Sequence, residues 1–88
     1  MNSYIVSYDL MAPHKDYSSL ISAIKSYGTY AKVLESCWIV RSNDSSNTIR
    51  TFLTTYMDSN DKIFVAKLTG EASWRNVLCT NDWLKNNL

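Results

Sequence analysis

The hydrophobic pattern changes its period along the chain, and the order of these changes restricts the fold more than any other feature. Residues 3–9 alternate as in a strand, and residues 16–27 repeat at helical spacing. Residues 30–41 are strand-like, residues 46–57 are helical, and residues 62–68 form the last clear strand pattern. This alternation predicts an α+β protein in which helices cover a sheet.

Segment 30–41 allows two interpretations. It fits one long strand or a hairpin that turns near Glu35–Ser36, and no Asn-Gly or Asp-Gly dipeptide marks the turn. We favour the hairpin, because four strands and two helices then make a balanced sandwich in the order βαββαβ, the ferredoxin-like or split βαβ pattern. The chain of 88 residues is predicted to be one domain, with a core over residues 1–68 and a C-terminal extension over residues 69–88.

Local signals agree with the helix assignments. Asp16 is a candidate N-cap, Gly28 stands where a helix C-terminus favours a left-handed residue, and Thr80–Asp82 can cap a short closing helix. Two helices cover only one face of a sheet, so a single copy would leave the other, apolar face bare in water. We therefore expect a homodimer whose copies meet through these uncovered faces.

The opening strand carries the strongest candidate site residue. Its side chains alternate between two faces, one with Tyr4, Val6 and Tyr8 and the other with Ile5, Ser7 and Asp9. Both faces carry apolar groups, which indicates a central strand. Such a strand would hold the Asp9 carboxylate on rigid backbone at the lip of the sheet, where metal ions and phosphates can reach it.

Asp9 is therefore the candidate catalytic residue and metal ligand. Two-fold symmetry would give two carboxylates facing one groove, which suits Mg²⁺ because this ion keeps several waters and takes few protein ligands. The ion would activate water and neutralise a phosphodiester. The alternative is a loop carboxylate that accepts backbone N–H bonds or caps the next turn.

Other side chains are candidates for nucleic-acid contact. His14, the only histidine, would act as a general base or bind phosphate. Lys15 and Arg41 would bind phosphates. The alternative for all three is a solvated surface position. Three tryptophans would either stack bases or pack in the core or dimer interface: Trp38, Trp74 and Trp83.

Composition excludes several classes of protein. Nine Lys/Arg against eight Asp/Glu give a net charge of +1, which excludes a polybasic protein that coats nucleic acid by charge alone. Cys37 and Cys79 fit no metal-binding spacing and are interpreted as reduced thiols of a cytoplasmic protein. No apolar run approaches the ~20 residues that span a bilayer, so we expect no membrane partner.

Several segments together resemble a family. They are Tyr8–Leu10, Ile24–Ser26, Gly28–Thr29, Glu35–Val40, Asp58–Asp61, Leu68–Ala72 and Trp83–Lys85. The chain resembles small bacterial proteins described as SinR-like, in the superfamily of the CRISPR-associated acquisition endonuclease and virulence-associated protein D. This resemblance implies a ferredoxin-like homodimer, a C-terminal segment that can cross to the partner sheet, and Asp9 as the metal-binding aspartate.

The same resemblance leaves two functions open. One is a Mg²⁺-dependent endonuclease, with RNA favoured over DNA as the substrate. The other is a non-catalytic dimeric binding or assembly module, either a toxin-like regulator or an accessory protein of a mobile element. Cleavage that depends on Asp9 would separate the first from the second.

Overall fold

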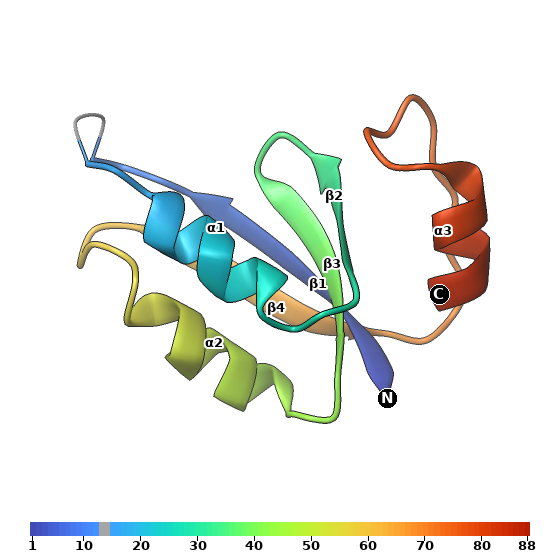
Figure 1. Cartoon of the computed structure of the whole chain (residues 1–88), viewed down its shortest axis with the longest axis horizontal. Helices are drawn as coiled ribbons and strands as arrows, with labels where there is room; N and C mark the ends of the chain where they lie inside the picture. Colours follow the sequence, from blue (N-terminus) through green and yellow to red (C-terminus); the bar gives the residue numbers. More distant parts are fainter. Residues whose placement is uncertain (13–14) are drawn as a thin grey trace.

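Helices lie against one face of a four-stranded sheet, and the C-terminal segment lies against the other (Figure 1). The structure is a computed structural model and describes residues 1–12 and 15–88. The elements are β1 (Asn2–Asp9), α1 (Ser18–Lys25), β2 (Tyr30–Leu34), β3 (Cys37–Ser42), α2 (Ser46–Thr54), β4 (Lys62–Leu68) and α3 (Asn81–Asn87).

The strands are ordered β2-β3-β1-β4, and each neighbouring pair is antiparallel. This arrangement is consistent with the ferredoxin-like pattern predicted from the sequence. The predicted central strand is confirmed, because Val6 of β1 pairs with Trp38 of β3 on one side and with Val65 of β4 on the other. The hairpin is also confirmed, since β2 and β3 are separate strands joined through Glu35–Ser36.

A buried core lies between the sheet and helices α1 and α2. Its fully or nearly fully buried residues are Tyr4, Val6, Tyr8, Leu20, Ala23, Ile24, Trp38, Val40, Ile49 and Leu53. The Trp38 indole Nε1 donates a hydrogen bond of 3.0 Å to the hydroxyl of Tyr8, which satisfies a buried polar group inside this core. The alternation predicted for the opening strand therefore holds, with the aromatic face towards the helices.

The helix ends follow from specific residues. Gly28 follows α1 with φ of 87°, in the left-handed region that glycine adopts without strain. The Asp16 carboxylate accepts a 2.9 Å bond from the Ser18 amide, although the N-cap position itself is Tyr17. Helix α2 is capped by Ser45, whose hydroxyl accepts from the Thr48 amide at 3.1 Å.

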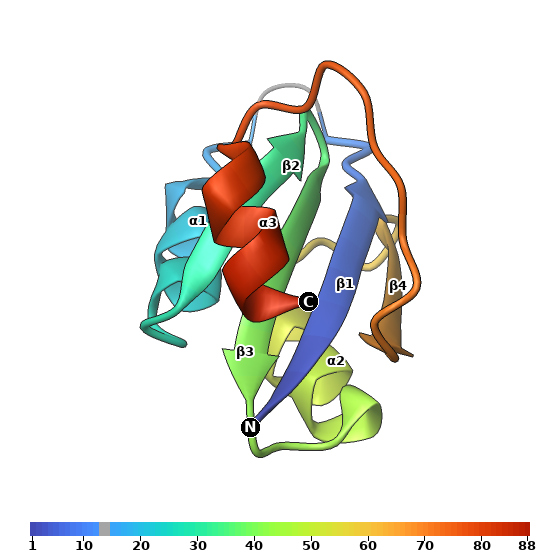
Figure 2. The same ribbon diagram turned by 90° about the vertical axis from the view of Figure 1, so that its right-hand side faces the viewer.

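The expectation of a bare second sheet face is wrong. The C-terminal segment, residues 69–88, folds back over this face, and α3 lies across β2 and β3 (Figure 2). Val33, Ile39 and Leu84 form the buried centre of a second core. Partly buried residues pack around it: Leu68, Trp74, Val77, Cys79, Trp83 and Leu88. The physical reason is that these tail side chains are themselves apolar, so the chain covers its own sheet.

Hydrogen bonds hold the C-terminal segment in place. The Leu78 amide donates to the Val33 carbonyl at 2.9 Å, and the Thr80 hydroxyl caps α3 by accepting from the Trp83 amide at 3.1 Å. The hydroxyl of Ser3 donates to the carbonyl of Asn87. The predicted closing helix and its cap are thus confirmed. Within the described ranges, no helix is both long and apolar enough to cross a membrane.

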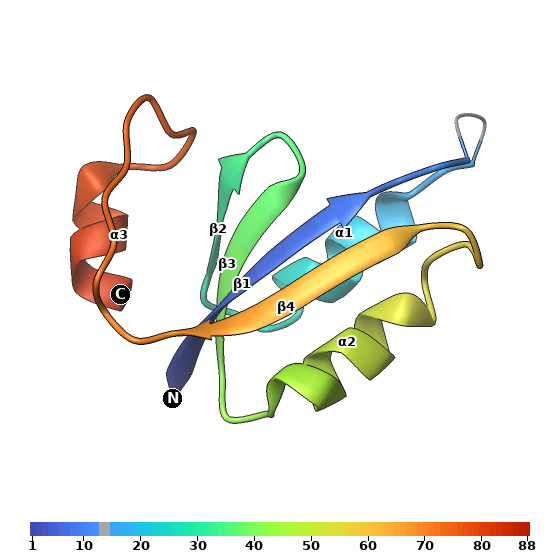
Figure 3. The ribbon, with the colours of Figure 1, turned by 180° about the vertical axis from the view of Figure 1, so that it is seen from behind.

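The C-terminal segment covers only part of the second face of the sheet. Strands β1 and β4 run from beside the C-terminal segment to the opposite end of the molecule, near the start of α1 (Figure 3). Four residues there face the same side as the second core and are not part of it. We call them the open end of the second face: Ser7, Asp9, Lys62 and Phe64.

Candidate functional site

Asp9 is exposed and is the last residue of β1. It pairs across the strands with Lys62 of β4. Among the described residues, the only salt bridge within 4 Å joins Lys32 Nζ to Glu35 Oε2 at 3.7 Å, so the Asp9 carboxylate and the Lys62 ammonium are neighbours that form no salt bridge. No hydrogen bond joins the Asp9 carboxylate to another described residue, so its oxygens are available to a ligand.

A shallow hollow of about 160 Å³ surrounds this carboxylate. It is lined by the open-end residues together with Tyr8 and Ile63. Phe64 is 66% exposed, which is unusual for a phenylalanine in the middle of a strand. The site therefore combines a carboxylate, an amine, a hydroxyl and an exposed aromatic ring on one rigid surface.

A second carboxylate, Asp61, was missed by the sequence reasoning. Its Oδ1 accepts hydrogen bonds from the Met11 amide at 2.6 Å and from the Tyr17 hydroxyl at 2.8 Å. Its Oδ2 accepts from the Asp58 amide at 2.7 Å. Asp61 therefore ties the segment after β1 to the turn before β4. The only sequence signal was the turn composition of residues 58–61, which does not reveal a long-range clamp.

This clamp shifts two ionisation equilibria. Partial burial alone would raise the pKa of Asp61, but hydrogen bonds from the Met11 and Asp58 amides, the Tyr17 hydroxyl and the nearby charge of Lys15 together lower it below its usual value. Burial and the hydrogen bond to Asp61 raise the pKa of Tyr17. Asp61 is therefore ionised and Tyr17 is a neutral donor at pH 7.

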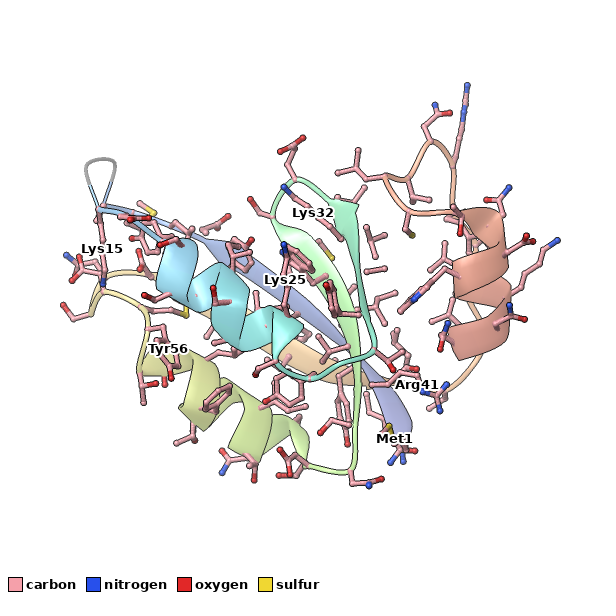
Figure 4. The ribbon with its side chains drawn as sticks, in the orientation of Figure 1. Met1, Lys15, Lys25, Lys32, Arg41 and Tyr56 are labelled. Carbon is pink, nitrogen blue, oxygen red and sulfur yellow. The ribbon has the colours of Figure 1, made fainter. Side chains whose placement is uncertain are left out.

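The other predicted contact residues are not brought to one place. Lys15 is near Asp61, with its Nζ 5.5 Å from the centroid of the Tyr17 ring, so it lies at the same end as Asp9. Arg41 pairs with Ser3, and the rise along β1 places that position about 20 Å from Asp9. Figure 4 shows Lys15 and Arg41 far apart, with Arg41 at the end of the sheet near Met1. His14 lies outside the described residues.

Arg41 has a structural role instead. Its guanidinium donates to the carbonyl of Asn87 at 3.2 Å and to the carbonyl of Met1 at 2.9 Å. It thereby joins the beginning of β1 to the end of α3. Two of its donors are thus engaged with backbone, which leaves fewer for a phosphate.

The tryptophans and cysteines belong to the cores. Trp38 is buried under the helices, while Trp74 and Trp83 pack in the second core. Both cysteines are free thiols, and burial raises the pKa of Cys37. A raised pKa keeps a thiol protonated, which disfavours its use as a nucleophile.

One chain alone offers a poor metal site. The described part of the chain contains no group of three or more His, Cys, Asp or Glu residues that could hold a metal ion. Asp9 contributes one free carboxylate, and Asp61 is engaged by its own hydrogen bonds. The donor set fits Mg²⁺ only where a second copy supplies a second Asp9, with waters completing the coordination.

No protein-family model matches the chain, and no solved structure matches it significantly.

Proposed function

We propose that this protein is a cytoplasmic, nucleic-acid-associated homodimer that cleaves RNA with Mg²⁺ held between the Asp9 carboxylates of two copies. One observation carries the proposal: Asp9 is exposed, free of partners among the described residues, and fixed at the end of the central strand beside Lys62. The resemblance to SinR-like proteins, whose superfamily includes Mg²⁺-dependent endonucleases, supports the same reading.

Phe64 gives the reason to expect a second copy at the open end. Its ring is 66% exposed and lies on the same side of the sheet as Asp9. Phe64 pairs directly with Ser7 across the strands, and Asp9 pairs with Lys62 two residues further along β1. A two-fold axis beside Asp9 would remove both Phe64 rings from water and bring both carboxylates to one seam.

The residues around Asp9 suit a phosphodiester substrate. Lys62 presents an exposed ammonium group next to the carboxylate and would contact a phosphate oxygen. Lys15 adds a second cation at the same end of the molecule. When bound, Mg²⁺ would neutralise charge on the phosphodiester and activate water for hydrolysis.

RNA cleavage tests the proposal directly. Purified protein is incubated with labelled single-stranded RNA and Mg²⁺, in the native form and as Asp9→Asn. The control is Asp44→Asn, which neutralises an exposed aspartate that is not part of the open end. We expect Asp9→Asn to lose more than about 100-fold in rate, because losing outer-shell metal partners alone costs 10–100-fold. Equal rates for all three proteins would mean that cleavage does not use Asp9.

Self-association tests the dimer. Sedimentation equilibrium at micromolar concentration should show a dimer that Phe64→Ser weakens by about 30-fold, the effect of a 2 kcal/mol hot spot. Leu78→Ala changes another exposed apolar residue, 57% exposed, and should leave association unchanged. A protein that stays monomeric at these concentrations would remove the paired carboxylates and with them the hydrolytic site.

A second function, the non-catalytic binding or assembly module, is favoured by the absence of a metal-binding group within the described residues of one chain. It predicts nucleic-acid or protein binding that survives Asp9→Asn. Binding without any Mg²⁺-dependent cleavage by the native protein would select this function.

A further inference from the structure

A groove of about 320 Å³ lies between the C-terminal segment and the second face of the sheet. Its walls include Ile5, Ile39 and Leu68 from the sheet and Trp74, Val77 and Leu84 from the segment. Its volume is at the lower end of the range typical of small-molecule sites, which are concave and mainly apolar with few polar groups.

The groove is a gap between the C-terminal segment and the sheet, and it reaches the central strand β1. Ile5 faces this groove from the central strand and is only half-buried, whereas Tyr4 and Val6 on the opposite face are buried under the helices. Leu84 is 1% exposed and closes one side, so the segment is firmly seated next to the gap. An apolar chain laid over Ile5 would complete the burial that the segment leaves unfinished.

One charged side chain belongs to the residues that line this groove. Among its described lining residues, Arg75 has the only charged side chain, and this side chain is exposed in the connection between β4 and α3. No acidic group of the described residues lies within 4 Å of its guanidinium. An apolar gap with a free guanidinium matches a molecule with an apolar chain and an anionic head.

We propose that this groove binds a medium-chain fatty acid, with the alkyl chain over Ile5 and the carboxylate on Arg75. The guanidinium fork matches the geometry of a carboxylate. This site is separate from the open end around Asp9 and does not depend on the proposed nuclease activity.

The indole N–H signals of the three tryptophans provide a direct assay by NMR. Trp74 lines the groove, whereas Trp38 is buried on the other side of the sheet and hydrogen-bonded to Tyr8. Saturable titration with decanoate should shift the Trp74 signal and leave the Trp38 signal unchanged. Movement of both signals together would indicate a detergent-like effect on the whole fold and would overturn the proposal.

A series of ligands tests the apolar contact of the alkyl chain, and a variant of Arg75 tests the contact with the carboxylate. Decanoate should bind more tightly than octanoate, by about fourfold for each added methylene that is buried. Octanoate should bind about fivefold more tightly than octanol, and Arg75→Gln should abolish that difference. Arg50→Gln, an identical change on α2, is the control and should preserve it.

A blocking variant separates the groove from other surfaces. Ala72 lines the groove but is exposed, so Ala72→Phe fills the space without disturbing a buried residue. We expect it to weaken decanoate binding at least tenfold while the unfolding midpoint stays the same. Unchanged binding by this variant, or equal affinity for octanoate and octanol in the native protein, would refute the site.

Discussion

Substitution of Leu84 tests whether the C-terminal segment is an integral part of the fold. It is 1% exposed in α3 and belongs to the same buried cluster as Val33 and Ile39 of the sheet. Leu84→Ala would remove most of the side chain that fills this cluster. The second core is small, so little else can compensate for the loss.

The expected cost follows from measured losses for buried leucines. Leu→Ala changes in cores typically cost about 2–5 kcal/mol, and the lower values occur where surrounding groups can relax. Because α3 is short and borders an open groove, we expect about 2–3 kcal/mol. The total stability of an 88-residue chain is on the order of 4–13 kcal/mol, so the melting temperature should fall by roughly 10–20 °C.

Urea unfolding followed by far-UV circular dichroism measures this change. Leu78→Ala is the matched control, since Leu78 lies in the same segment but is 57% exposed. It should change the free energy of unfolding by less than about 0.5 kcal/mol. If Leu84→Ala costs no more than Leu78→Ala, the C-terminal segment is not seated on the sheet and the second core does not exist.

Two further predictions concern local interactions. Asp61→Asn should speed hydrogen exchange of the Met11 amide, whereas Asp58→Asn should not, because no hydrogen bond to the Asp58 carboxylate is found among the described residues. Since the pKa of Asp61 is lowered in the folded state, the stability that its charge contributes is fully present above the ordinary carboxyl value of 3.8 and is lost as the pH falls through the lower, folded-state value. The stability difference between the native protein and Asp61→Asn should therefore shrink as the pH falls through this value, and a difference that does not change with pH would contradict this account. Ser45→Ala removes the cap of α2 and should cost about 1 kcal/mol in urea unfolding, and an unchanged midpoint would show that the cap is not formed in solution.

The sequence predicted the βαββαβ order because each segment carries its own period, which needs no knowledge of its neighbours. It did not predict where the C-terminal segment lies. Trp74 and Val77 show no strand or helix period, and their partners Val33 and Ile39 are distant in the chain. Only the three-dimensional arrangement brings these apolar groups together.

The candidate site was predicted only in part for a related reason. Asp9 could be placed at the end of a central strand, but residues 63–66 are continuously apolar, so their pattern does not say which side chains face outward. The pairing of Asp9 with Lys62 settles the register and turns Phe64 to the uncovered side. Asp61 could not be found because its donors at Met11 and Tyr17 come from a different part of the chain.

The position of the C-terminal segment also limits how two copies can meet. Because α3 already covers β2 and β3, a second sheet can approach only over the open end, unless the segment leaves its own sheet. These two routes respond differently to substitution. If copies meet over the open end, Phe64→Ser weakens association without lowering the stability of the monomer, and Leu84→Ala lowers stability without weakening association. If the segment must leave first, Leu84→Ala loosens its attachment and strengthens association. Concentration-dependent sedimentation of both variants therefore distinguishes the routes, and only the first leaves the Asp9 carboxylates facing each other beside a covered Phe64.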